Sequence, residues 1–295
     1  MSGDVRTRIE RIAWDRTGTF GLVARRVADG REIAAGEPDR LFQLASTFKV
    51  PVLATLEARV EAGELDWASR HTLTDAVKSP GSGILIDLEA GLEPSLEDLA
   101  MLMMTLSDNT ATDMCFAIAE QPRIMDRMGA WGIAPISILN DCKTLLADAV
   151  GVTVEEIVAA DPAGKQALME RGPNPDAGAN TEDLTRTNLA SPRAMATLLE
   201  GIAAGRLLPR PRARHMWQIM GLEWYRHRIP PQLPPRVRWA TKSGTLGGVV
   251  NDVGVLFTDQ GPIAMAMLAK GLADQGRWER VIAAAARVVY EELGR

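Results

Sequence analysis

Alternating apolar and polar positions predict strands at both ends of the chain. Near the N-terminus, two alternating runs, 20–27 and 32–35, flank Ala28-Asp29-Gly30. An Asp-Gly pair is a strong turn signal, so this stretch predicts a β-hairpin. Near the C-terminus, the same alternation predicts three more strands, at residues 237–242, 249–258 and 262–269.

Helical periodicity fills most of the sequence between these strands. The stretch 46–62 is apolar on most sides, which predicts a buried helix. Pro94-Ser95 predicts the start of a helix that runs to residue 106, and Ser191-Pro192 predicts the start of one that ends at Ile202. Further helices are predicted at residues 4–15, 110–129, 154–171, 211–221 and 278–293.

Strands at both termini with helices between them predict an α+β fold of the α/β sandwich type. We expect an antiparallel sheet formed by both termini, with flanking helices, plus an all-helical subdomain. Residues 1–295 would form a single domain, with an α/β part at about 1–45 and 210–295 and a helical part at about 46–209. The segment 140–190 is the hardest to place, because it mixes a helical stretch with a polar loop.

Composition narrows the classes of partner. The chain has 295 residues, 46% of them hydrophobic, and a formal net charge of -5. This balance argues against a nucleic-acid partner, which would require a basic surface. No run of 18 apolar residues occurs, so we expect no membrane span. The oligomeric state is not predicted by the sequence.

The N-terminal residues and the cysteines bear on compartment and cofactors. The start, MSGDVRTRIERIAW, has no basic region followed by an apolar one, which predicts a cytoplasmic protein without a signal peptide. If a signal had been removed, a periplasmic or secreted location is the alternative. Cys115 and Cys142 lack metal-ligand spacing and are expected to be reduced thiols. No metal or organic cofactor is implied.

The first candidate for chemistry is Ser46, which lies three residues before Lys49 at the start of the predicted buried helix. Residues three apart share one face of a helix, so the amine could accept the proton of the serine hydroxyl. The alternative is an ordinary helix start whose lysine extends to the surface.

Two further boxes follow downstream. Ser107-Asp108-Asn109 lies between two predicted helices, where its alternative interpretation is an N-cap cluster. Lys242-Ser243-Gly244-Thr245 follows a predicted strand, where its alternative is a glycine-rich strand end. Each box alone is weak evidence for a site.

Together the three boxes are far more specific. S-x-x-K, S-D-N and K-[ST]-G in this order are the motif set of class A β-lactamases and penicillin-binding proteins. The flanking phrases FQLASTFKV, SDNTAT and ASPRAMATLLEGI agree with that set. The sequence therefore resembles the serine β-lactamase-like hydrolases over nearly its whole length, and the resemblance implies a β-lactamase/transpeptidase-like fold.

The resemblance implies four catalytic residues. Ser46 would be the acylated nucleophile, and Lys49 its general base or proton relay. Ser107 would pass the proton to the leaving nitrogen or oxygen. Lys242 would hold Ser107 and an anionic group of the substrate electrostatically.

It also implies a set of substrate-binding residues. Asn109 would bind the substrate amide, and Ser243 its carboxylate. The N–H groups of Ser46 and Thr245 would form an oxyanion hole, which Gly244 keeps open at the strand edge. Arg228, fourteen residues before Lys242, would be a carboxylate-binding arginine. The alternative is a surface arginine, and Arg226 competes for the same role.

The chain departs from the class A pattern in one place. The family's E-x-x-L-N motif supplies the glutamate that activates the deacylating water, and the corresponding region 138–149 contains no glutamate. A replacement base could come from further along the chain, with Glu182 the most loop-like candidate. Solvated surface positions are the alternative for each of Glu155, Glu156, Glu170 and Glu182.

These observations predict a serine hydrolase that forms an acyl-enzyme at Ser46 and cleaves an amide, lactam or ester bond of a small, carboxylate-bearing substrate. One alternative is an esterase, amidase or D-peptidase with a substrate other than a β-lactam. Another is a penicillin-binding or sensing module that is acylated without fast turnover. A non-catalytic protein with the fold alone is the third alternative.

Overall fold

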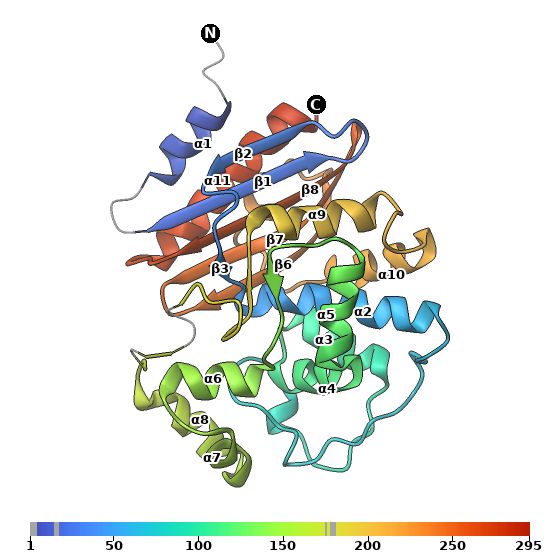
Figure 1. Ribbon diagram of the computed structural model, residues 1–295, viewed down its shortest axis with the longest axis vertical. Helices are drawn as coiled ribbons and strands as arrows, with labels where there is room; N and C mark the ends of the chain where they lie inside the picture. The colour runs from blue at the N-terminus through green and yellow to red at the C-terminus, as the bar shows by residue number, and fades with distance from the viewer. Residues whose placement is uncertain (1–4, 15–17, 175, 178–180) are drawn as a thin grey trace. The chain divides into compact units, whose positions relative to one another are not determined.

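A computed structural model describes residues 5–14, 18–174, 176–177 and 181–295 (Figure 1). Contacts within the chain divide it into two compact units. The first comprises Met1–Phe48, Met128–Ile136 and Leu189–Arg295, and the second comprises Lys49–Arg127 and Ser137–Asn188. Residues 189–209 fall in the first of these units. The single-domain organisation stays a prediction.

The first unit is built on a five-stranded antiparallel sheet that uses both ends of the chain, as predicted. The N-terminal hairpin turns at Gly30, whose φ of +73° suits glycine. β6 is an edge strand, and in its register with β7 Ser243 lies opposite Asp252. The strand order is β2 (Glu32–Gly36), β1 (Thr19–Arg26), β8 (Gly261–Lys270), β7 (Val249–Thr258) and β6 (Arg238–Leu246).

Helices cover both faces of this sheet. Figure 1 shows α9 (Pro192–Ala203) in front of the strands and α11 (Gln275–Leu293) behind them. α1 (Val5–Ala13) packs on α11, and their apolar side chains join those of the sheet in one core. α10 (Arg210–Met220) packs on β6. The expected first helix included residues 4 and 15, which lie outside the described residues.

Short elements complete the first unit. β3 (Phe42–Gln43) pairs with β5 (Leu189–Ala190) in a small three-stranded sheet whose other strand is β4 (Ile136–Ser137). A 3₁₀ turn, η1 (Ala45–Phe48), follows β3 after one intervening residue. Two-residue strands are too short to show an alternating pattern, so the sequence did not predict them. A second 3₁₀ turn, η5, spans Pro230–Gln232.

The second unit is helical. Its core packs α4 (Asn109–Ala119) against α2 (Lys49–Glu61) and α3 (Leu96–Thr105), with Met103, Met104 and Phe116 among the buried side chains. A capping box between Ser95 and Asp98 begins α3 where the sequence predicted a start. The remaining elements are η2 (Leu85–Asp87), α5 (Gln121–Ala130), α6 (Cys142–Val150), α7 (Val154–Ala159), α8 (Pro162–Leu168) and η3 (Met169–Arg171).

Two predictions about these helices were wrong in detail. The helix expected at 110–129 is two helices, because Glu120 adopts a left-handed φ of +60°. The helix expected at 154–171 is broken before Pro162, since proline disfavours helix in the residue before it, and Asp161 caps the new start. α6 lies in the segment that the sequence left unplaced. No helix in the described ranges is long and apolar enough to cross a membrane.

Candidate active site

Ser46 lies in a tightly fixed turn of the first unit. Of residues 42–50, all of which the structure describes, Ser46 alone is partly exposed. Ala45, immediately before it, has a left-handed φ of +46°. The Nδ2 of Asn251 on β7 donates to the carbonyls of Gln43 (2.7 Å) and Leu44 (3.0 Å). The sheet therefore fixes the backbone just before Ser46. The φ of Ala45 is one that is energetically unfavourable for residues other than glycine.

β6 passes directly beside this turn at Gly244. A Cβ atom there would lie 2.9 Å from the carbonyl oxygen of Leu44 and 3.0 Å from the backbone nitrogen of Ser46. Such an approach leaves room for glycine only. The close packing fixes the Ser46 N–H relative to the edge strand that carries Thr245, which is exposed.

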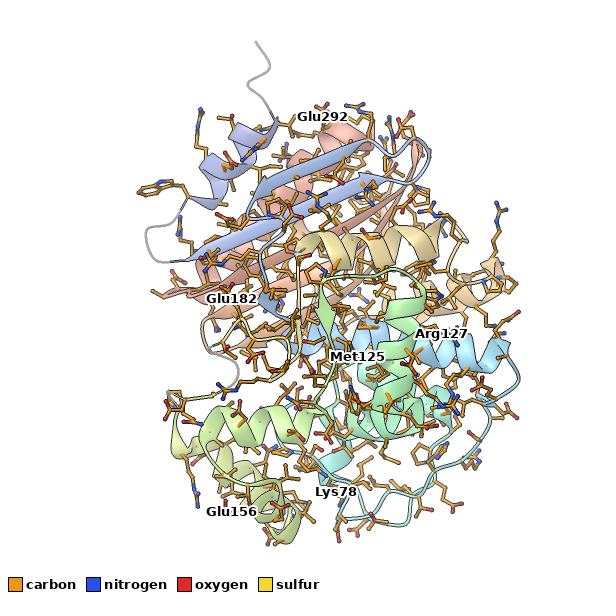
Figure 2. The ribbon with its side chains drawn as sticks, viewed as in Figure 1. Lys78, Met125, Arg127, Glu156, Glu182 and Glu292 are labelled. Atoms are coloured by element: carbon orange, nitrogen blue, oxygen red, sulfur yellow. The ribbon has the colours of Figure 1, made fainter. Side chains whose placement is uncertain are left out.

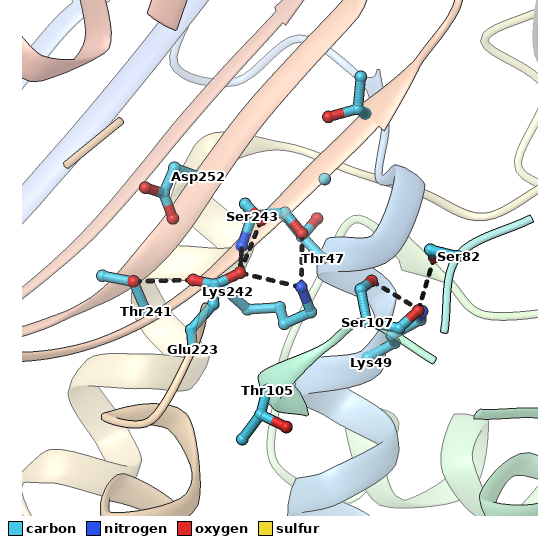
Figure 3. Close-up of polar contacts among 12 residues, drawn as sticks. Thr47, Lys49, Ser82, Thr105, Ser107, Glu223, Thr241, Lys242, Ser243 and Asp252 are labelled. Carbon is cyan, nitrogen blue, oxygen red and sulfur yellow. Dashed lines mark hydrogen bonds and ion pairs between the residues drawn. The ribbon is translucent and has the colours of Figure 1, made fainter. Parts of the chain in front are cut away.

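A buried carboxylate that the sequence did not predict, that of Glu223, is hydrogen-bonded to residues of β6. Oε1 of Glu223 accepts hydrogen bonds from Nζ of Lys242 (3.0 Å), N of Ser243 (2.7 Å) and Oγ of Ser243 (2.6 Å). Its Oε2 accepts from Oγ1 of Thr241 (2.9 Å). Figure 3 shows these side chains converging on one carboxylate. Glu223 and Lys242 are both fully buried, so this is an ion pair in a desolvated setting.

The turn after α10 positions Glu223, whose N–H donates to the carbonyl of Met220 (3.3 Å). Burial would raise the pKa of its carboxyl, but the charge of Lys242 and the hydrogen bonds from Ser243 and Lys242 outweigh burial and hold that pKa below its ordinary value. Glu223 therefore carries a negative charge at neutral pH. No motif in the stretch GLEWYRHR distinguishes Glu223 from a surface glutamate, so the sequence analysis did not identify it.

A second buried carboxyl lies opposite Ser243 on β7. Oδ2 of Asp252 accepts a hydrogen bond from the N–H of Ile229 (2.9 Å). Burial and, next, the negative charge of Glu223 raise the pKa of Asp252 to about 8. The two carboxyls thus differ in charge at neutral pH, since Asp252 is largely protonated.

Of the two arginines considered for this region, Arg228 is buried and Arg226 is exposed. Nη1 of Arg228 donates to the carbonyls of Gly244 (2.8 Å) and Asn251 (2.7 Å), and its Nη2 donates to Oγ1 of Thr245. Arg226 instead stacks over the Trp239 ring. The guanidinium of Arg228 therefore connects the end of β6 to β7 through hydrogen bonds to both strands.

The second unit brings the S-x-x-K lysine and the S-D-N box together. Lys49 begins α2 and is fully buried. Its Nζ donates to the carbonyl of Ser107 (2.7 Å), to Oγ of Ser107 (2.9 Å) and to Oδ1 of Asn109 (3.1 Å). Figure 3 shows Lys49 beside Ser107. These contacts link two boxes that lie 58 to 60 residues apart in the chain.

The backbone of the S-D-N box also contains a non-glycine residue with a left-handed φ, as does the backbone before Ser46. Ser107 has a left-handed φ of +56°, and Asp108 caps α4 by accepting from the N–H of Ala111 (2.9 Å). The N-cap interpretation is therefore correct for Asp108, while its neighbours contact Lys49. Ser82, a residue that sequence reasoning missed, donates to the carbonyl of Ser107 (2.8 Å).

Most of the region 138–149, where a class A glutamate is expected, belongs to α6 (Cys142–Val150). Asp141 caps α6 by accepting from the N–H of Thr144 (2.8 Å). Behind it, Asp113 accepts from the N–H groups of Cys142 (2.6 Å) and Lys143 (3.1 Å) and from the hydroxyl of Ser79. Burial, and then Asp141, raise the pKa of Asp113 to about 7.

The four glutamates considered as substitutes are all exposed, and Figure 2 marks Glu156 and Glu182 among them. Glu156 belongs to the capping box of α7 with Thr153. This exposure agrees with the surface interpretation. Cys115 and Cys142 are free thiols, both buried. In the described ranges, no three His, Cys, Asp or Glu side chains gather in a metal-binding arrangement.

The predicted residues thus fall into two groups. The first unit holds Ser46, Arg228, Lys242, Ser243, Gly244 and Thr245, and the second holds Lys49, Ser107 and Asn109.

Comparisons with known proteins bear on the family and the fold. The chain is 28% identical over 269 residues to the β-lactamase regulatory protein BlaB of Streptomyces cacaoi, which covers 85% of this chain and 84% of that protein. The crystal structure of a β-lactamase from Sphaerobacter thermophilus superposes with a TM-score of 0.80 at 27% identity, over 98% of this chain and 97% of that one. PBP-A superposes with a TM-score of 0.78 at 23% identity, over 98% and 95%, which shows a shared fold.

The sequence profile described as "Beta-lactamase enzyme family" matches residues 4–293, nearly the whole chain. The fold expected from the resemblance is confirmed by these structures. The chain belongs to the beta-lactamase enzyme family.

Proposed function

We propose that this protein is a serine hydrolase that forms an acyl-enzyme at Ser46 and cleaves an amide, lactam or ester bond of a small molecule. The observation that carries the proposal is the contact of the buried Lys49 amine with both Ser107 and Asn109. A buried lysine held on a hydroxyl and an amide oxygen is arranged for proton transfer rather than for solubility. Membership of the family supports hydrolase-like chemistry.

In the proposed reaction, Oγ of Ser46 attacks the carbonyl carbon while its proton passes to Lys49. The N–H groups of Ser46 and Thr245 would stabilise the oxyanion. The bond to the leaving nitrogen or oxygen then breaks, and that atom receives the proton through Ser107. Water adds to the resulting ester, releases the acid and restores the serine hydroxyl, which closes the balance of atoms and protons.

The second candidate function is a penicillin-binding or sensing module that stays acylated because deacylation is slow. Two observations favour it. The region 138–149 has no glutamate to activate water, and the S. cacaoi relative is named as a regulatory protein. An esterase or amidase is a further candidate, in which the leaving group diffuses away after acylation and is no longer present when water attacks the acyl-enzyme.

A hydrolysis screen separates these functions. Nitrocefin, p-nitrophenyl esters and D-amino-acid amides are run side by side with wild type and with Ser46→Ala. The proposal expects turnover of at least one class by wild type and none by Ser46→Ala. Stoichiometric release without further turnover would favour the sensing module. Equal rates for both proteins would refute the assignment of Ser46.

A further inference from the structure

The K-S-G strand already has a carboxylate bound to it. A serine hydroxyl has one proton, and that of Ser243 is donated to Glu223 at 2.6 Å. The backbone N–H of Ser243 is donated to the same oxygen at 2.7 Å. Neither donor remains for the carboxylate of a substrate, which is the role that the resemblance implies for Ser243.

The positive charge of this strand is also neutralised. Nζ of Lys242 lies 3.0 Å from Oε1 of Glu223 and 2.9 Å from the carbonyl of Ser243, so two of its three N–H groups are engaged. Both members of the ion pair are fully buried, where water does not screen their attraction. An incoming anion would meet the charge of Glu223 as well as that of Lys242.

Arg228 does not supply a replacement cation. Its Nη1 and Nη2 donate to two carbonyls and to the Thr245 hydroxyl, and its guanidinium lies 3.4 Å from the carboxylate of Glu279. The Nη1 and Nη2 groups of Arg228 are therefore engaged by acceptors of the protein itself, as Lys242 and Ser243 are engaged by Glu223.

We propose that the carboxylate of Glu223 occupies the hydrogen-bond donors of Lys242 and Ser243 that would otherwise bind a carboxylate of the substrate. The enzyme therefore selects acyl substrates that have a neutral group in place of that carboxylate. The proposal rests on the serine hydrolase function above. It differs from the expectation of a carboxylate-bearing substrate, because that expectation assigned to the substrate the hydrogen bonds that Glu223 receives. Glu223 is thus a specificity-determining residue that acts through Lys242 and Ser243.

Two matched pairs of compounds test this directly. One is benzylpenicillin and its methyl ester; the other is an N-acylated glycyl ester of D-lactate and the same ester of D-lactamide. Within each pair only the carboxylate differs. Wild type is expected to prefer the neutral member in acylation kcat/KM by at least about tenfold, and Glu223→Gln to reduce or reverse that ratio by a similar factor.

Glu279→Gln is the matched control. It removes one negative charge beside Arg228 but touches neither Lys242 nor Ser243, so its ratio should stay within about twofold of wild type. If Glu223→Gln does not fold, the same ratio is measured for Ser243→Ala. If the Ser243 hydroxyl only binds Glu223, the ratio stays near that of wild type. If the hydroxyl binds the substrate, acylation by the carboxylate member alone becomes slower, and that result overturns the proposal.

Binding separates this proposal from the proposed function. Calorimetric titration of Ser46→Ala and of Ser46→Ala/Glu223→Gln with benzylpenicillin and its methyl ester needs no chemistry at Ser46. Tighter binding of the methyl ester by the first protein and of benzylpenicillin by the second supports the role of Glu223, whether or not Ser46 is the nucleophile. Tighter binding of benzylpenicillin by both, equal affinities, or no binding of either compound to either protein contradicts it.

Discussion

The two units each bury a lysine from a signature box, but they surround it differently. In the second unit, Lys49 donates to three neutral oxygen atoms of Ser107 and Asn109. In the first, Lys242 donates to the carboxylate of Glu223 at 3.0 Å. Lys242 is thus part of a buried ion pair, whereas these contacts of Lys49 are to neutral acceptors. Under the proposed function, Lys49 transfers a proton and Lys242 holds the Glu223 carboxylate.

The largest expected effect follows from removing the proton acceptor. Lys49→Met should lower kcat/KM for the best ester found in the screen by about 10³-fold or more, because Ser46 loses its base. Its control is Lys143→Met, which removes another buried lysine of the second unit that donates to the carbonyl of Ala76 (3.0 Å). Near-normal activity of folded Lys49→Met would remove Lys49 from the mechanism.

For stability, in contrast to activity, we expect the loss of Lys242 to have a larger effect than the loss of Lys49. Lys242→Met leaves the Glu223 carboxylate buried without its cation, which should lower the free energy of unfolding by about 3–5 kcal/mol. Lys49→Met leaves neutral oxygens unsatisfied and should cost about 1–3 kcal/mol. Urea unfolding measures both. The double variant Lys242→Met/Glu223→Gln should regain most of the loss, and a double variant as unstable as Lys242→Met would show that the ion pair is not its cause.

A smaller effect is expected where β6 meets the turn of Ser46. Gly244→Ala places a methyl group within 2.9–3.0 Å of the backbone of that turn, and we expect a loss of about 1–3 kcal/mol in unfolding free energy together with slower acylation. Gly247→Ala, whose added Cβ would meet nothing within 4 Å, is the control. Equal behaviour of the two variants would contradict the close packing.

Per pH unit, the smallest effect is a pH dependence of stability that differs between the units. The folded-state pKa of Asp252 is raised to about 8, so the folded protein keeps a proton that the unfolded chain releases above its ordinary pKa. This contribution is fully present below about pH 4 and is lost as pH rises through about 8, at up to about 1.4 kcal/mol per pH unit. Asp252→Asn should flatten the curve up to about pH 8.

Asp113 gives the corresponding comparison in the second unit. Its pKa is raised to about 7, so Asp113→Asn should flatten the same curve only up to about pH 7. Unfolding free energies measured from pH 5 to 9 distinguish the two. Unchanged slopes in both variants would show that neither carboxyl holds its proton in the folded state.

The sequence predicted what short patterns can encode. Alternation predicted the five-stranded sheet, and Ser191-Pro192 predicted the start of α9. The described non-glycine residues with positive φ are Ala45, Ser107 and Glu120; the first immediately precedes the S-x-x-K box and the second begins the S-D-N box. Local sequence carries such information because strands, caps and turns are set by neighbouring residues.

What the sequence did not predict depends on contacts between distant segments. Glu223 lies 19 residues before Lys242 and has no motif around it, so only folding of α10 against β6 reveals its role. Ser82 reaches Ser107 across 25 residues for the same reason. α6 begins at an Asp141 cap inside a mixed segment, where its short length left too little periodicity to recognise.

The central claim, acylation at Ser46, is tested most directly by peptide mass mapping. The protein is mixed with the best neutral ester, quenched with acid, and digested with trypsin, which cuts after Arg40 and Lys49 and so isolates Leu41–Lys49 with Ser46 as one peptide. The account predicts that this peptide gains the mass of the acyl group in wild type and that no peptide gains it in Ser46→Ala. An adduct on any other peptide, or the same adduct in Ser46→Ala, would contradict it.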